Sequence, residues 1–417
     1  MEAREERGLA IAATTKIQHT KDGYIVPAQS GNGTYTVKMD GCKPQCSCPD
    51  FGIRGGKCKH IYAVEYTMRR EEKADGTTVV TKTVKVTYGQ NWPVYNQAQV
   101  HEPERFAELL HDLCGGITMA PQKRRGRPSH PTSDIVFAAT SKVYSTVSGR
   151  RASHDLDEWL RKGYLACKPS YNSIFDHLES PALTPILKGL IEESALPLSA
   201  VESDFAADST GFATSVYSRW YDHKYGKERT RQVWVKTHIM CGVKTHIVTT
   251  AEATPFESND GAQLPALVAQ TAQGFNLREV SADKAYSTKR NLHVIESVGA
   301  TPYVPFRAYS NGMSHGFDPL WNRMWHYYNF NRSAFLEHYH KRSNAETAFS
   351  MMKAKFGGNI RSKTPTAQVN EVLCKVLAHN LCCLIQSIYE LNLEPVFWER
   401  KDSHEVAPVM ALKATPW

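Results

Sequence analysis

From Val201 onward, short apolar runs typical of strands alternate with longer periodic runs typical of helices. The segment from Phe205 to Gly211 predicts a strand, and two further strands over 234–241 and 245–251 form a hairpin around Gly242. The later pattern predicts a helix over 264–272, a strand over 279–283, a helix over 288–298 and a strand over 303–306. Strands separated by helices make parallel crossovers, so this segment predicts an α/β fold with a mixed sheet and flanking helices.

Two of the predicted strands carry an aspartate near the end, Asp208 in the first and Asp283 in a later one, and Glu346 adds a carboxylate from a predicted helix. Oxygen ligands that converge in this way suit two Mg²⁺ ions, which keep waters and leave room for phosphates. A metal pair can activate the attacking oxygen and stabilise the leaving oxygen of an in-line displacement. Two alternatives stay open: either aspartate can serve a turn or cap, and Asp204 is a rival ligand.

Glu346 also belongs to the pattern Y-x2-R-x3-E-x6-K, formed with Tyr339, Arg342 and Lys353. Offsets of three, four and seven place all four side chains on one face of a single helix. A carboxylate among a phenol and two cations suits a metal ion held beside phosphates. The alternative is a capping box, because Ser343 and Glu346 also follow S-x-x-E.

The motifs Asp208-Ser-Thr-Gly, Asp283-Lys-Ala-Tyr and the stripe from Tyr339 to Lys353 resemble those of bacterial insertion-sequence transposases of the DDE class with a Y-R-E-K motif. The resemblance covers about residues 200–390. It implies a ribonuclease-H-like core in which Asp208, Asp283 and Glu346 are catalytic and bind two Mg²⁺ or Mn²⁺ ions.

The same resemblance assigns Tyr339, Arg342 and Lys353 to the DNA backbone near the end of the mobile element. Tyrosine and arginine donors suit phosphate oxygens, and lysine acts as a point charge. The implied chemistry is hydrolytic nicking at element ends, followed by attack of the freed 3′-hydroxyl on target DNA. Because two ends are joined, we expect at least a dimer on double-stranded DNA.

Near the N-terminus, four residues follow the spacing C-x-C-x9-C-x-H: Cys46, Cys48, Cys58 and His60. Three thiolates and an imidazole form the closed tetrahedral set of a structural zinc. Upstream, alternating runs beginning at Tyr24 and Tyr35 predict a hairpin. The pattern over about residues 24–66 resembles the SWIM zinc finger, which implies one Zn²⁺ ion and a DNA or protein partner.

A basic segment from Pro121 to Pro128 contains Arg124, Arg125 and Arg127. Its Arg-Gly-Arg-Pro core resembles an AT-hook, and arginine in a narrow A·T minor groove is favoured by the negative potential there. The alternative is a solvated basic linker. Before it, residues 77–88 predict a strand or hairpin and residues 103–113 a short helix that ends at two glycines.

After the basic segment, residues 133–147, 153–162 and 170–193 predict helices, the last with breaks at Pro181 and Pro185. Short helices of this kind fit a helix-turn-helix-like unit. His379, on an apolar helix predicted over 369–391, is interpreted as structural. Aromatic residues over 317–339 are interpreted as core rather than as a base-stacking platform.

Composition limits the class of protein. The formal net charge of +8 suits a polyanionic partner, and a hydrophobic content of 41% supports real cores in a chain of 417 residues. The charged N-terminus predicts no secretory signal, and no window predicts a membrane span. Ten cysteines without such a signal favour reduced thiols or metal ligands, hence a cytoplasmic protein that is nucleoid-associated when DNA-bound.

These patterns together predict five parts: a SWIM-type zinc finger module over 1–92, a linker with the basic segment over 93–130, a helical DNA-binding region over 131–198, a ribonuclease-H-like catalytic domain over 199–395 and a C-terminal tail over 396–417. The predicted function is DNA transposition. One alternative is a non-catalytic, domesticated DNA-binding regulator, and another is a structure-selective nuclease that cleaves without joining strands.

Overall fold

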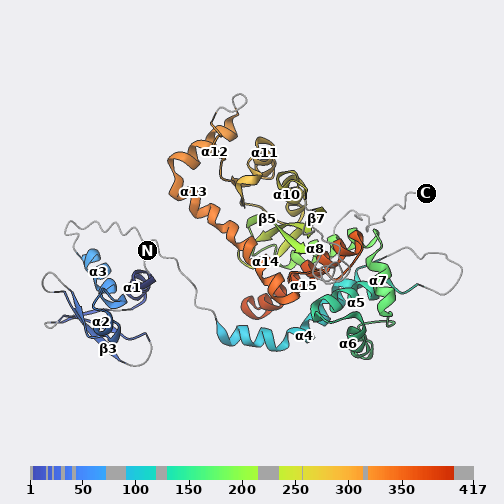
Figure 1. The fold of residues 1–417 in the computed structure, drawn as a ribbon, viewed down its shortest axis with the longest axis horizontal. Helices are drawn as coiled ribbons and strands as arrows, with labels where there is room; N and C mark the ends of the chain where they lie inside the picture. Colours follow the sequence, from blue (N-terminus) through green and yellow to red (C-terminus); the bar gives the residue numbers. More distant parts are fainter. Residues whose placement is uncertain are drawn as a thin grey trace, which may run out of the picture. The chain divides into compact units, whose positions relative to one another are not determined.

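The computed structural model describes residues 3–15, 17–20, 23–29, 33–39, 44–71, 91–118, 129–214, 234–255, 257–312 and 318–398. The chain divides into two compact units, Met1–Gln90 and Asn91–Trp417 (Figure 1). The predicted strand over 77–88 and the three arginines of the basic segment lie outside the described residues.

The first unit combines a small antiparallel sheet with helices. Its strands are β1 (Gln18–Thr20), β2 (Gly23–Pro27), β3 (Thr34–Lys38) and β4 (Gln45–Cys46), in the order β1-β2-β3-β4. The predicted hairpin is the β2–β3 pair, in which Tyr24 faces Val37. Helices α1 (Ala3–Thr14) and α3 (Lys59–Glu71) pack together, and the short α2 (Pro49–Arg54) lies between β4 and α3 in sequence.

The second unit begins with helices α4 (Trp92–Gly115), α5 (Thr132–Ser145), α6 (Gly149–Arg161), α7 (Tyr171–Leu178) and α8 (Leu183–Ala195), followed by the 3-10 turn η1 (Leu196–Leu198). The prediction of a short helix starting at Pro103 is wrong, because α4 begins at Trp92 and contains Pro103 in its interior. Burial of Ala98 and Glu102 upstream of that proline shows that packing overrides its helix-breaking tendency. Pro185 lies in the first turn of α8, where proline is tolerated, and does not break it.

A five-stranded mixed sheet forms the centre of this unit. Its strands are β5 (Asp204–Ala213), β6 (Trp234–Gly242), β7 (Val248–Pro255), β8 (Glu279–Ala282) and β9 (Thr301–Tyr303), in the order β7-β6-β5-β8-β9. The β5, β8 and β9 strands run parallel, whereas β6 is antiparallel to both of its neighbours. Sequence analysis therefore predicted the hairpin and the parallel crossovers correctly.

The crossover segments are the turn η2 (Asp260–Ala262) with α10 (Leu264–Gly274), and the turn η3 (Lys284–Tyr286) with α11 (Lys289–Ser297). The ring of Phe205 on β5 lies 5.5 Å from the ring of Phe275 at the end of α10, so Phe205 points to the face of the sheet on that side. Side chains alternate along a strand, so the even-numbered positions of β5 face the other side of the sheet. That second face is covered by the C-terminal helices.

These later elements are α12 (Pro319–Phe330), α13 (Arg332–Tyr339), the turn η4 (His340–Arg342), α14 (Ser343–Phe356) and α15 (Pro365–Leu391). Figure 1 shows α13 leading into α14 beside the sheet; α13 packs against β8 and β9, and α14 packs against both β5 and β6. The α15 helix is the hub of the unit, because it packs against α4, α5, α8 and β7.

Buried polar side chains fix α15 to its neighbours. Asn380 accepts from the Val248 amide at 2.9 Å and donates to the Val248 carbonyl at 2.7 Å and the Ser194 hydroxyl at 2.9 Å. Lys375 donates to the carbonyls of Phe356, Gly357 and Asn359, at and just beyond the end of α14. Both of these buried side chains thus have hydrogen-bond partners, as burial in a core requires.

By length and composition α15 could also cross a membrane, although the sequence predicted no span. In the structure, 78% of its most apolar window is buried inside the protein. Its charged residues Glu371 and Lys375 are buried and hydrogen-bonded within the unit. The helix therefore serves as a core helix of this unit.

Acid should destabilise the second unit through His379, as its interpretation as structural implies. Burial lowers the pKa of His379 from 6.5 to about 4. The unfolded chain then binds more protons than the folded one between those pH values, so the free energy of unfolding falls as pH drops from 6.5 to 4, by up to about 3 kcal/mol from this group.

The variant His379→Gln cannot take up that proton, yet its amide can still donate to the His246 carbonyl as His379 does. Urea unfolding at pH 7, 5.5 and 4.5 should show a shallower acid loss in the variant than in the parent. An unchanged pH slope would contradict the assignment.

Candidate active site and metal centre

The paired strands β5 and β8 align two rows of carboxylates on one face of the sheet. Asp204 faces Glu279 in the parallel register, and the last paired residues are Ala207 and Ala282. Asp208 and Asp283 come next on the two strands, four positions beyond Asp204 and Glu279. Since even offsets keep side chains on the same face, the second row is the continuation of the first.

Asp208 was predicted near the end of its strand, but β5 continues to Ala213. Its position is nevertheless the one that the prediction required, because β8 ends at Ala282, directly before Asp283. Asp208 lies close to Asp283 because the parallel pairing of β5 with β8 ends just before both residues, although β5 itself continues.

In the first row, cations neutralise both carboxylates. Arg278 donates to Asp204 through Nε at 2.9 Å and Nη2 at 2.8 Å, and Lys341 Nζ lies 2.7 Å from Asp204 Oδ2 and 2.6 Å from Glu279 Oε2. His338 Nδ1 lies 2.8 Å from Glu279 Oε2. Burial alone would raise the pKa of Asp204, but its bonds to Arg278 and Lys341 outweigh burial and lower it. Asp204, the rival ligand, is therefore committed to ion pairs.

The second row keeps an excess of negative charge. Glu346, on α14, adds a third carboxylate to this row. Arg342 bridges Asp208 and Glu346, with Nη1 2.6 Å from Asp208 Oδ2 and Nη2 2.5 Å from Glu346 Oε1. Burial raises the pKa of Asp208, and the nearby charges of Glu346 and Asp283 add to the rise although the Ser209 amide and Arg342 oppose it. One arginine thus shares a neighbourhood with three carboxylates.

The donor set of this neighbourhood fits divalent cations, because magnesium prefers carboxylate oxygens and three carboxylates share one arginine here. Among the described residues, the cysteine–histidine group near the N-terminus is close enough together to hold a metal ion as it stands, whereas the three carboxylates do not form such a group. The guanidinium of Arg342 lies between Asp208 and Glu346.

The remaining members of the predicted stripe also reach this face. Lys353 Nζ donates to Thr210 Oγ1 at 2.6 Å, and Thr210 lies two residues after Asp208 on the same side of β5. Burial lowers the pKa of Lys353. Arg342 lies over the ring of Tyr339 at 6.0 Å, and burial raises the pKa of that phenol. The structure therefore lines the four stripe residues along β5.

The capping-box alternative for Glu346 is wrong. The helical path runs from α13 through η4 into α14 without a side-chain cap at Arg342, the residue before the first turn of α14. Ser343 Oγ donates to the His340 carbonyl at 2.9 Å, so it behaves as a residue inside a helix. Glu346 pairs with Arg342 instead.

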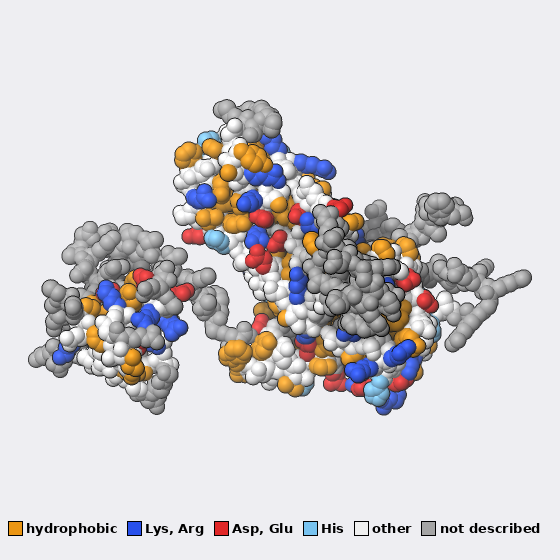
Figure 2. Space-filling view, viewed as in Figure 1, with side chains coloured by type: hydrophobic (Ala, Val, Ile, Leu, Met, Phe, Trp, Pro, Cys, Tyr) orange, Lys and Arg blue, Asp and Glu red, His pale blue; other side chains and the backbone are white. Residues whose placement is uncertain are grey.

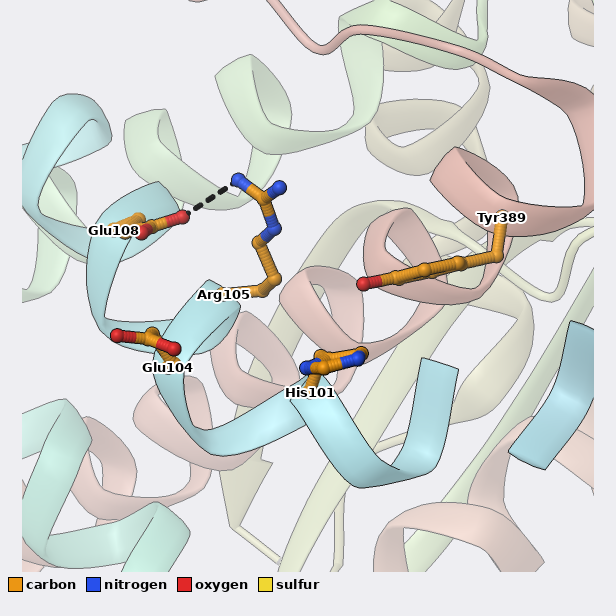
Figure 3. A pocket seen from close by; sticks show the side chains of 5 residues that line it. All are labelled: His101, Glu104, Arg105, Glu108 and Tyr389. Atoms are coloured by element: carbon orange, nitrogen blue, oxygen red, sulfur yellow. Dashed lines mark hydrogen bonds and ion pairs between the residues drawn. The ribbon is translucent and has the colours of Figure 1, made fainter. Parts of the chain in front are cut away.

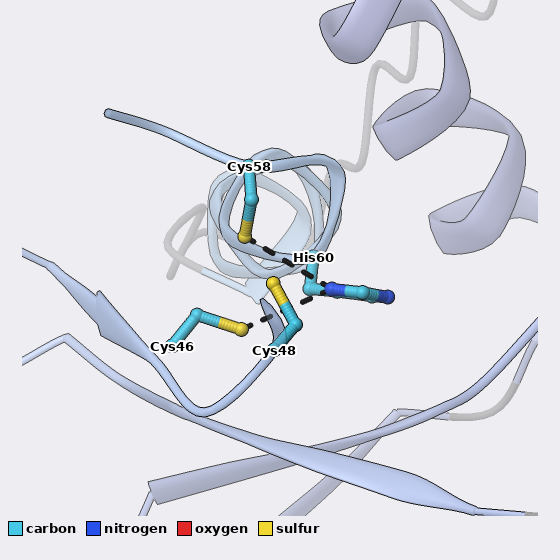
Figure 4. Close-up of side chains that lie close together, drawn as sticks. All are labelled: Cys46, Cys48, Cys58 and His60. Carbon is cyan, nitrogen blue, oxygen red and sulfur yellow. Dashed lines mark hydrogen bonds between the residues drawn. The ribbon is translucent and has the colours of Figure 1, made fainter. Parts of the chain in front are cut away.

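In the first unit, Cys46, Cys48, Cys58 and His60 form one buried cluster with all ligand atoms within 4.8 Å of one another (Figure 4). Local sequence explains the convergence. Cys48 Sγ accepts from the Phe51 amide at the start of α2, Gly55 ends α2 in the left-handed conformation at φ 64°, and the chain then returns to place His60 in the first turn of α3.

Within this cluster one sulfur, that of Cys58, is favoured as a thiolate, whereas burial raises the pKa of Cys48. Hydrogen bonding with Cys46 lowers the pKa of Cys58 to about 3 and raises the pKa of Cys46, as expected for two sulfurs that share one proton. His60 Nδ1 faces the sulfurs, at 3.8 Å from Cys46 and 4.0 Å from Cys58. His60 Nε2 is buried without a hydrogen-bond partner in the part of the chain that the structure describes. Three sulfurs and Nδ1 thus fit a tetrahedral metal.

Sequence analysis missed the ion pairs of the first carboxylate row, including Lys341 and His338. The signal was present, because Asp204 precedes Asp208 by the same spacing as Glu279 precedes Asp283. It also missed a surface pocket between α4 and α15 lined by His101, Glu104, Arg105, Glu108 and Tyr389 (Figure 3). In this pocket Arg105 forms an ion pair with Glu108 at 2.8 Å. The pocket is therefore a polar groove, and its five lining side chains do not suggest a reactive group.

Comparison with known proteins agrees with this geometry. Residues 199–381 match a family model described as a transposase DDE domain, and residues 35–68 match the SWIM zinc finger. Over 286 residues the chain is 26% identical to a probable transposase for an insertion sequence element of Archaeoglobus fulgidus, covering 66% of this chain and 82% of that protein. The chain is therefore similar to transposases of the DDE class over the larger part of its length. It carries a SWIM zinc finger ahead of the DDE domain.

We expect the finger to bind one zinc ion per chain and to depend on it for folding. Chelation should expose residues 44–71 to protease while the unit Asn91–Trp417 remains intact, because the two units are separately compact. Metal analysis with proteolytic mapping measures both effects. Cys58→Ser should lose the metal, whereas Cys167→Ser, outside the finger, should keep it. Full zinc retention by Cys58→Ser would contradict the ligand set.

The two carboxylate rows should respond differently to neutralisation. Asp204→Asn removes the charge of a buried carboxylate that accepts hydrogen bonds from Arg278 and Lys341, which should cost about 1–3 kcal/mol of unfolding free energy. Asp208→Asn removes one of several mutually repelling carboxylates and should cost much less. Urea unfolding in the presence of chelator measures both. Equal losses would show that the rows do not differ in charge balance.

Proposed function

We propose that the chain catalyses metal-dependent DNA cleavage at element ends and strand transfer into target DNA through Asp208, Asp283 and Glu346. The observation that supports this most is the excess negative charge of the second carboxylate row, where Arg342 bridges Asp208 and Glu346 beside Asp283. The sheet order β7-β6-β5-β8-β9 supports a ribonuclease-H-like core for the domain.

In this proposal Asp208, Asp283 and Glu346 hold two Mg²⁺ or Mn²⁺ ions. When bound, the two metal ions would activate the attacking oxygen and stabilise the leaving oxygen. The protein then supplies position and charge: Arg342, Tyr339 and Lys353 line the same face of the sheet and hold the DNA backbone. Arginine and tyrosine donate to phosphate oxygens, while Lys353 contributes charge next to Thr210.

The N-terminal parts extend the contact with DNA. The finger holds one Zn²⁺ ion through Cys46, Cys48, Cys58 and His60, and it binds DNA or a protein partner. The basic segment with Arg124, Arg125 and Arg127 reaches the minor groove of A·T-rich DNA. On the face of the second unit shown in Figure 2, basic side chains are interspersed with acidic ones. We therefore assign no single patch on that face to DNA.

The helices over 131–198 bind the double-stranded element end, and the protein acts as a dimer when two ends are brought together. Such a DNA-bound protein belongs to the cytoplasm and associates with the nucleoid. The domesticated-regulator alternative has less support, because the three carboxylates are all present and the chain resembles a transposase over most of its length.

Cleavage of a labelled duplex tests the proposal directly. The duplex carries the inverted repeats that flank the reading frame, and the reaction contains Mg²⁺ or Mn²⁺. Asp283→Asn and Glu346→Gln should each lower the cleavage rate by about 100-fold or more, because each removes charge from the group that stabilises the transition state. Glu252→Gln, on β7, is a matched control and should keep near-parental activity.

Strand joining in the same assay separates the enzyme classes. A transposase should convert cleaved ends into joined products on a target plasmid, whereas a structure-selective nuclease should stop at cleavage. Parental rates in Asp283→Asn would rule out the proposed site.

A further inference from the structure

The turn η4, between α13 and α14, contacts the sheet through two of its side chains, and a histidine near the end of α13 adds a third contact. His338 contacts Glu279, Lys341 contacts both Asp204 and Glu279, and Arg342 contacts Asp208. Offsets of three and four along a helical path place these side chains on one face. The path therefore meets carboxylates of β5 and β8 along its sheet-facing side.

Lys341 is the central contact of the three. Its ammonium joins two strands, because Asp204 belongs to β5 and Glu279 to β8, and both carboxylates are largely buried, with 8% and 12% of their side chains exposed. A buried ion pair with short bonds fixes geometry well, since loss of either partner leaves a costly uncompensated charge. The backbone of η4 is thus fixed at residue 341.

Arg278 and Lys341 together balance the charges of Asp204 and Glu279, but the two cations lie on different elements. Arg278 already holds Asp204 with two hydrogen bonds, from a side chain 65% exposed at the start of β8. The printed ion pairs of Arg278 reach only Asp204 and Glu279, both on the sheet. Lys341, by contrast, joins the sheet to the turn that carries Arg342.

We propose that Lys341 is a positioning residue for the candidate active site: by clasping Asp204 and Glu279 it places the adjacent Arg342 between Asp208 and Glu346. The role rests on the proposed function of that site, because Arg342 is assigned there to the DNA backbone. Lys341 itself touches neither member of the Asp208–Glu346 pair in the described contacts.

A stability measurement tests the clasp without any activity. The coupling between Arg342 and Asp208 is measured from the unfolding midpoints of Arg342→Gln, Asp208→Asn and the double variant of the full chain, in chelator. In the parent background the two shifts should be non-additive, because the side chains are bonded at 2.6 Å.

The same cycle is then repeated with Lys341 replaced. Because Lys341→Met alone leaves buried carboxylates unneutralised and could unfold the chain, it is combined with Glu279→Gln. In this background the coupling should vanish. The matched control replaces another lysine–glutamate pair, Lys188→Met with Glu252→Gln on α8 and β7, whose atoms lie 2.6 Å apart. There the coupling between Arg342 and Asp208 should persist, and its persistence in the Lys341 background as well would overturn the proposal.

An activity cycle adds a second readout. Lys341→Met with Glu279→Gln should lower the cleavage rate at saturating DNA and metal by about 10-fold or more, as expected when a catalytic group is misplaced. Adding Arg342→Gln should then cause little further loss, and Lys341→Arg should restore much of the rate. Independent, multiplicative losses would reject positioning. If the parent cleaves no DNA, the proposed function fails, whereas the stability cycle still decides whether the clasp exists.

Discussion

The parallel pairing of β5 with β8 is the constraint on which the rest of the second unit depends. Its register brings Asp204 opposite Glu279 and continues directly to Asp208 and Asp283. Four carboxylates on one sheet face repel one another, so the face requires cations from elsewhere. Arg278 and the helical path from α13 to α14 supply them, and the two rows differ in how many cations each receives.

That difference appears in the opposite pKa directions of two residues on one strand. The pKa of Asp204 is lowered by its arginine and lysine partners, whereas the pKa of Asp208 is raised by burial and by neighbouring carboxylates. A group kept ionised by fixed partners adds rigidity, and a group with surplus negative charge has affinity to spare for a ligand. Two carboxylates four residues apart on β5 therefore have opposite charge environments, and under the proposed function only Asp208 would bind metal.

The sequence allowed the mixed sheet, the finger ligands and the Tyr339-to-Lys353 stripe to be predicted, because each depends on local periodicity or spacing. The start of α4 could not be predicted from the sequence, because burial of Ala98 overrides the helix-breaking tendency of Pro103. The position of Asp208 relative to Asp283 could not be predicted either, because it depends on where the neighbouring strand β8 ends. The ion-pair partners of Asp204 lie far from it along the chain. Long-range register and pairing of this kind leave little local signal.

The contacts of Lys375 have a consequence for α14 as a whole. Its ammonium binds carbonyls at and beyond the C-terminal end of α14, while Arg342 holds the N-terminal end to β5. The segment after α14 then returns to β5 through the bridge between Ala213 and Asn359. Both ends of α14 are therefore bonded to neighbouring elements, and Glu346, in the first turn of α14, lies on a helix that is anchored at each end.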